Sequence, residues 1–106
     1  MRNTYATVSL GAIKNNAAIV RKTCGETVAI CAIIKADAYG HGMVKVAEAL
    51  SLSGPSKVDY FAVALVSEGV TLRDNGITLP ILVLGSIDSS EIQIALENDQ
   101  IGRAHV

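Results

Sequence analysis

The sequence feature that most constrains the fold is an unbroken apolar run over residues 28–34, which ends at Lys35. Ile, Val and Ala dominate this segment, and a strand is expected over residues 27–34. A strand that is apolar on both faces is typical of a parallel sheet covered on both sides. We therefore predict an α/β fold with parallel strands.

The same alternation of strand and helix patterns continues along the chain. Further strands are expected over residues 5–10, 60–64 and 80–84, and helices over residues 12–23, 43–52, 67–74 and from Asp88 or Ser89 to about 98. Strands separated by helices imply right-handed parallel crossovers. An open doubly wound sheet and part of a (β/α)8 TIM-like barrel both fit this order. A closed barrel needs about 250 residues, so a barrel would be incomplete in a chain of 106.

Composition narrows the class of partner. The net charge is −1, and nine basic and ten acidic residues are mixed along the chain, which argues against a nucleic-acid or membrane-surface partner. The longest apolar run is far too short to span a membrane, and the N-terminal residues show no signal-peptide pattern, so we expect a cytoplasmic protein. The spacing of Cys24 and Cys31 fits neither a zinc site nor a redox pair, so free thiols and no metal site are expected.

The residues most suited to chemistry follow the first apolar run. A lysine at the end of a buried strand most often marks only where the chain reaches water. Lys35, however, lies at the carboxyl end of a strand, where ligands bind in parallel α/β folds, and its amine can form a Schiff base with an aldehyde. Gly40 and Gly42 precede a helix whose N-terminus favours phosphate, and Tyr39 offers a hydroxyl group. We assign no chemistry to His41.

The two glycines also permit a competing interpretation as a dinucleotide-binding loop. The third glycine of that fingerprint is missing, because Lys45 occupies its position. A generic nucleotide-binding α/β domain is therefore the weaker hypothesis.

The segment from Lys35 to Gly42, Lys-Ala-Asp-Ala-Tyr-Gly-His-Gly, resembles the cofactor-lysine signature of alanine racemases, in which the third position is Asn or Asp. All eight contiguous positions agree. Residues 10–16, 64–68, 72–73, 76–77 and 80–85 are also similar to that family in order and spacing. Ser9 departs from the family, which usually has an aspartate there, but it lies outside the cofactor motif.

The resemblance implies a barrel followed by a C-terminal β-domain, in a homodimer that uses pyridoxal 5'-phosphate. It implies that Lys35 binds the cofactor covalently and is one of two acid/base groups at the substrate Cα, and that Tyr39 donates a hydrogen bond to the cofactor phosphate. The second base would be a tyrosine from the C-terminal domain of the partner subunit. The implied reaction interconverts L-alanine and D-alanine and supplies D-alanine for bacterial peptidoglycan.

The chain is expected to hold only part of such an enzyme. Residues 1–99 would be the N-terminal part of the barrel, and residues 100–106 a non-native tail, because the last six residues match one reading frame of a sequencing-library adapter. We expect the chain alone to be inactive. Two alternatives share the lysine motif or the fold: a serine or broad-specificity amino-acid racemase, and a non-catalytic pyridoxal-phosphate-binding protein.

Overall fold

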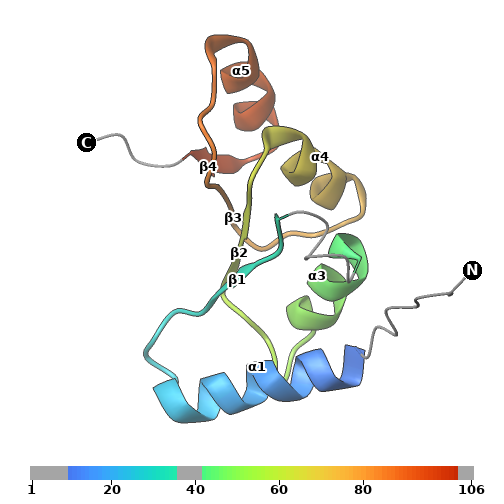
Figure 1. Cartoon of the computed structure of the whole chain (residues 1–106), viewed down its shortest axis with the longest axis vertical. Coiled ribbons are helices and arrows are strands. Elements are labelled where there is room, and N and C mark those ends of the chain that lie inside the picture. The colour runs from blue at the N-terminus through green and yellow to red at the C-terminus, as the bar shows by residue number, and fades with distance from the viewer. Residues whose placement is uncertain (1–9, 36–41, 103–106) are drawn as a thin grey trace, which may run out of the picture.

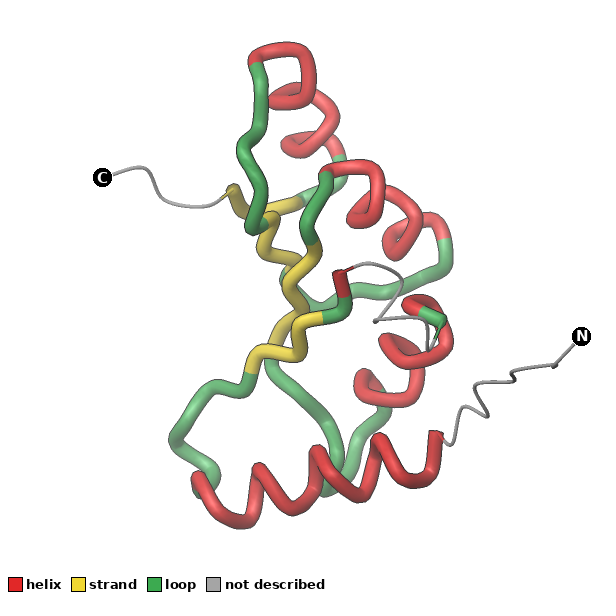
Figure 2. The backbone as a smooth tube through the Cα atoms, in the orientation of Figure 1, coloured by secondary structure: helices red, strands yellow, loops and turns green. Residues whose placement is uncertain are grey.

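A computed structural model describes residues 10–35 and 42–102 of the chain (Figure 1). Figure 2 shows that helices and strands alternate along this part of the backbone. The expected strand over residues 5–10 lies outside the described residues, except for Leu10, which begins a helix. The elements are α1 (Leu10–Cys24), β1 (Cys31–Ile33), α3 (Met43–Ser51), β2 (Tyr60–Val63), α4 (Val66–Asp74), β3 (Ile81–Val83), α5 (Ser89–Glu97) and β4 (Gln100–Gly102).

The strands form one parallel sheet in the order β1-β2-β3-β4. Phe61 of β2 is opposite Ala32 of β1 and Ile81 of β3, so the strands are in register across the sheet. Consecutive strands are neighbours, and a helix connects each strand to the next. This arrangement confirms the predicted parallel α/β fold, present here as an open part of a barrel.

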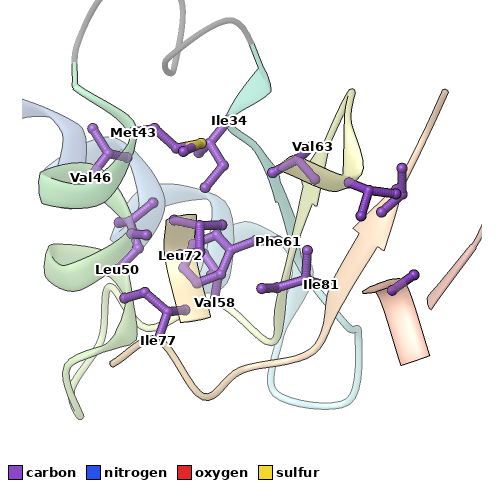
Figure 3. Packing of buried hydrophobic residues seen from close by; sticks show 14 residues of the cluster. Ile34, Met43, Val46, Leu50, Val58, Phe61, Val63, Leu72, Ile77 and Ile81 are labelled. Carbon is purple, nitrogen blue, oxygen red and sulfur yellow. The ribbon is translucent and has the colours of Figure 1, made fainter. Parts of the chain in front are cut away.

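The hydrophobic core lies between the sheet and the helices α3 and α4. Phe61 and Val63 of β2 point toward the helices with Ile81 of β3, while Leu72 of α4 packs against them from the other side (Figure 3). All four side chains are fully buried. Residues two apart in a strand share a face, so one face of the sheet supplies this core.

The expectation that the first strand is buried on both faces is wrong. The side chains of Ile33 and Val28 are 50% and 46% exposed. In the described sheet β1 pairs only with β2. The side chain of Ile34 lies in the core beside α3 (Figure 3), so Ile33, one residue earlier, points to the other face. The strand is also shorter than predicted, because its pairing begins only where β2 begins, at Tyr60.

Capping hydrogen bonds mark the end of α1 and the start of α5. The amide of Gly25, just after α1, donates a hydrogen bond of 2.8 Å to the carbonyl of Arg21. At the start of α5, the amide of Glu91 donates to Asp88 Oδ1 at 3.0 Å, and Glu91 Oε1 accepts from the amide of Asp88 at 3.3 Å. This reciprocal capping box fixes the start of α5.

The expectations about cysteines and membranes can also be compared with the structure. Cys24 and Cys31 are free thiols, as predicted. Within residues 10–35 and 42–102, no helix is long and apolar enough to cross a membrane.

The strand β4 was not predicted, because residues after 98 show no strand pattern. It forms by pairing with β3, where Gln100 is opposite Ile81. Its formation depends on an existing strand edge more than on local sequence preference. The boundary between a domain ending at residue 99 and a non-native tail stays a prediction, which the codons of the encoding DNA test.

Candidate active site at the carboxyl edge of the sheet

Lys35 lies at the carboxyl edge of the sheet, where the sequence predicts it. Its neighbour Ile34 is 2% exposed and inserts its side chain into the core beside Met43 (Figure 3). The amide of Ile34 also donates a hydrogen bond of 2.9 Å to the carbonyl of Ala62 in β2. Lys35 follows with helical backbone and a partly buried position. The residue before the lysine is thus anchored by both its side chain and its amide, which holds the lysine at this edge.

The carboxyl end of β2 is tied to the start of α4. Glu68 Oε1 accepts hydrogen bonds from the amides of Ala64 and Leu65, at 2.7 and 2.9 Å. These amides follow Val63, the last residue of β2, and lie beyond the residues that pair with β1 and β3. A carboxylate that accepts two amide hydrogen bonds holds the turn from β2 into α4 rigidly.

The carboxyl end of β3 lies directly against that turn. The amides of Leu84 and Gly85 donate to the carbonyls of Val63 and Ala64, at 2.8 and 3.1 Å. A Cβ atom at Gly85 would overlap the carbonyl oxygen of Ala64. Gly85 therefore permits a close approach that a side chain would prevent. Lys35 lies on the same edge as this rigid pair of strand ends.

Among the described elements, α3, α4 and α5 begin at this same edge, and their first turns differ in charge. Glu68 and Glu91 lie in the first turns of α4 and α5, whereas the first turn of α3 contains no acidic residue and includes Lys45. Gly42, the N-cap of α3, has φ of 88° and open space where a Cβ would lie. Because helix N-termini carry partial positive charge, the start of α3 is the one of these three that best suits an anion.

Asp88 is a second carboxylate near this edge, but it acts as a helix cap. The hydroxyl of Ser90 donates to it at 2.6 Å, and this bond, with the amides of Glu91 and Ser90, holds the pKa of Asp88 below its usual value. A carboxylate that is kept ionised by local hydrogen bonds is a poor proton donor at neutral pH. Tyr39 lies outside the described residues, so its role stays a prediction.

Two surface hollows lie away from this edge, at the amino ends of the strands. One, of about 290 Å³, is lined by Arg73, Ile77 and Asp99 among others, and the second, of about 400 Å³, by Lys14 and residues 53–56. Lys35 lines neither of them. In β/α barrels the amino edge contributes to stability and the carboxyl edge to chemistry, so the carboxyl edge with Lys35 is the candidate site.

Sequence reasoning overlooked the structural role of Glu68. A local signal was present, because Glu68 stands three residues after the N-cap Leu65, the spacing of a capping box. The motif is incomplete, because Leu65 at its first position has no side-chain hydrogen-bond acceptor. The carboxylate half of the motif acts alone here.

The fold and the site define a class of protein: a segment of a parallel β/α barrel with a lysine two residues after its first described strand. The chain matches the sequence model of the family described as "Alanine racemase, N-terminal domain" over residues 8–102. The chain belongs to this family.

Curated relatives and solved structures agree with this assignment. Alanine racemase 1 of Bacillus subtilis (strain 168) is 42% identical over 98 residues, which cover 92% of this chain and 24% of the relative. Alanine racemase from Bacillus anthracis with bound L-Ala-P superimposes with a TM-score of 0.84 at 37% identity, over 97% of this chain and 27% of that one. Alanine racemase of Clostridium difficile 630 in complex with cycloserine superimposes with a TM-score of 0.75 at 43% identity, over 86% of this chain and 23% of that one. The chain thus spans about a quarter of the length of the curated relatives it matches.

Proposed function

We propose that this chain is the N-terminal part of a pyridoxal-phosphate-dependent alanine racemase, and that Lys35 binds the cofactor. The observation that carries the proposal is the position of Lys35, the first residue of the eight-residue motif, at the carboxyl edge of the sheet. The names of the relatives favour alanine as the substrate over serine or a broad range of amino acids.

The residues present fit this cofactor. Lys35 provides a primary amine for the aldehyde group, and Gly42 leaves open space at a helix start that favours the phosphate. Tyr39 would add a hydroxyl donor to the phosphate. Both ends of the cofactor would therefore have partners at one edge of the sheet.

When bound, pyridoxal phosphate supplies an electron sink for the charge left on the substrate Cα after proton removal. The Lys35 Nζ would hold the cofactor through its aldehyde carbon and, once released, accept or donate the proton at Cα on one face. The anchoring of Ile34 in the core fixes the backbone from which the Lys35 side chain extends. A positioned general base of this kind contributes about 10²–10⁴-fold to the rate.

Inversion at Cα needs a second acid/base group on the opposite face. We propose that it comes from the remaining three quarters of a full-length racemase, in a cytoplasmic homodimer that produces D-alanine for peptidoglycan. The 106-residue chain by itself is then a cofactor-binding segment with no racemase activity.

Reductive trapping tests the assignment of Lys35. The chain is incubated with pyridoxal phosphate, reduced with borohydride, digested, and mapped by mass spectrometry. We expect the pyridoxyl label mainly on Lys35, its loss in Lys35→Ala, and its retention in Lys22→Ala, a matched change at an exposed lysine in the last turn of α1. An even distribution of label over the five lysines would overturn the proposal.

A further inference from the structure

The register of β1 on β2 decides where Lys35 lies. The pairing of β1 with β2 spans only Cys31 to Ile33, and β1 has no second neighbour within the described sheet. A shift of one residue would move Lys35 by about 3.3 Å and turn its side chain to the other face. A short strand at the sheet edge therefore needs an additional determinant of register.

Hydrophobic burial is a weak determinant of register in this strand. Every residue from 28 to 34 is apolar, so a shifted strand would place Ile33 in the core position of Ile34. The two side chains are identical, and register is weakly specified where both faces of a strand carry similar residues. Another interaction must distinguish the observed register from the shifted one.

A polar cluster lies at the amino end of β1, directly before the ladder. Asp59 Oδ2 accepts a hydrogen bond of 2.6 Å from the amide of Ile30, and the amide of Asp59 donates one of 2.9 Å to the carbonyl of Ile30. The two bonds join the residues just before Cys31 and Tyr60, which are the first pair of the ladder. This reciprocal pairing places Ile30 opposite Asp59 in the observed register. Backbone amides are alike, so the register also requires contacts that hold the segment before Ile30 in place.

Arg21 completes the cluster from the last turn of α1. Its guanidinium forms an ion pair with Asp59 Oδ2 at 2.7 Å and donates to the carbonyls of Val28 and Gly25, at 2.7 and 3.2 Å. The arginine side chain is 12% exposed, so its donors are largely shielded from water. One guanidinium thus links α1, the segment leading into β1 and the residue before β2.

We infer that Arg21 and Asp59 are positioning residues for Lys35, because they set the register of β1 from the end opposite to the lysine. The inference rests on the proposed function for the role of Lys35. The register itself is a separate claim and can be measured without the cofactor.

Disulfide trapping measures the register. Tyr60→Cys places a thiol opposite Cys31, at a strand separation of about 4.8 Å, which lies within the usual Cα separation of a disulfide. Cys24→Ser removes the competing thiol. In this background of the full chain we expect rapid formation of the Cys31 bridge under mild oxidation. Failure to form the bridge with Arg21 and Asp59 intact would overturn the inference.

The positioning variants are then introduced into that background. Asp59→Ala should slow bridge formation by about fivefold or more, as expected for loss of a charge-assisted contact, and Arg21→Lys should slow it because the amine lacks the planar fork. Lys22→Ala and Asp74→Asn, exposed charges at the ends of α1 and α4, are matched controls that should leave the rate unchanged. If circular dichroism shows that Asp59→Ala is unfolded, the rate of bridge formation in Arg21→Lys decides the result.

A second readout separates positioning from general stability. In chains that retain Tyr60 and Cys24, the ratio of pyridoxyl label on Lys35 to label on Lys45 should fall in Arg21→Lys. A purely structural role would lower the unfolding free energy and leave this ratio unchanged. Unchanged bridge formation and label ratio in Arg21→Lys would overturn the inference. Bridge formation could be slower in Arg21→Lys while Lys35 carries no label even in the unaltered chain. That result would instead overturn the proposed function.

Discussion

Replacing Gly85 with alanine tests the close contact between the ends of β2 and β3. The added Cβ would overlap the backbone carbonyl oxygen of Ala64, well inside the closest approach of 3.0 Å that real Cβ atoms show. A backbone carbonyl has no rotamer with which to move away, so the segments that follow β2 and β3 must separate. The hydrogen bond of 3.1 Å from Gly85 N to Ala64 O then lengthens beyond the usual limit of about 3.2 Å.

We expect Gly85→Ala to lower the free energy of unfolding by about 1–3 kcal/mol, the usual cost of overpacking. In a domain of this size each kcal/mol lowers Tm by about 4–8 °C. Urea and thermal unfolding of the 106-residue chain, followed by circular dichroism, measure the change.

Gly69→Ala is the matched control for this prediction. Its Cβ would overlap the side-chain amide of Gln100, which is the end of a flexible side chain. The helix α4 gains about 1 kcal/mol from alanine in place of glycine, and this offsets loss of the 3.1 Å bond from Gln100 Nε2 to Val66 O. A Gly85→Ala chain as stable as the unaltered one, or one more stable than Gly69→Ala, would refute the steric reasoning.

Two further predictions concern the core and the response to acid. Phe61→Ala should cost about 3–5 kcal/mol in urea unfolding, because the side chain is fully buried against both helices, and a loss below about 1 kcal/mol would contradict this packing. The pKa of Asp59 is lowered from its ordinary 3.8, first by the amide of Ile30 and then by Arg21. Its contribution to stability is therefore present above about pH 3.8 and lost as the pH falls through the lowered value. Acid unfolding curves of Asp59→Asn should show a weaker pH dependence below pH 4 than the unaltered chain, and identical slopes would contradict the assignment.

Much of the fold follows from local patterns in the sequence. The helical spacing of apolar residues predicts α1, α3, α4 and α5 to within about three residues, and the Asp88–Glu91 pair marks the start of α5. The abrupt end of the apolar run at Lys35 also predicts where the lysine lies relative to the sheet. These features could be predicted because each depends on residues that are close in the sequence.

The remaining features depend on residues far apart in the chain. β1 begins at Cys31 rather than at residue 27 because its partner begins at Tyr60, and Asp59 ends the ladder by binding the amide of Ile30. The ion pair of Arg21 with Asp59 joins residues 38 positions apart. No local pattern marks either contact, and β4 likewise depends on the free edge of β3.

The central claim is that this chain provides the cofactor lysine of an alanine racemase. Residues 8–102 can replace the matching segment of Alanine racemase 1 of Bacillus subtilis, which supplies the remaining three quarters of the enzyme. Interconversion of L- and D-alanine by this chimera is then measured with pyridoxal phosphate present, with Lys22→Ala, an exposed lysine in the last turn of α1, as the matched control. We predict an active chimera whose rate falls by at least about a hundredfold in Lys35→Ala and is unchanged in the control. Full activity in Lys35→Ala would contradict the claim.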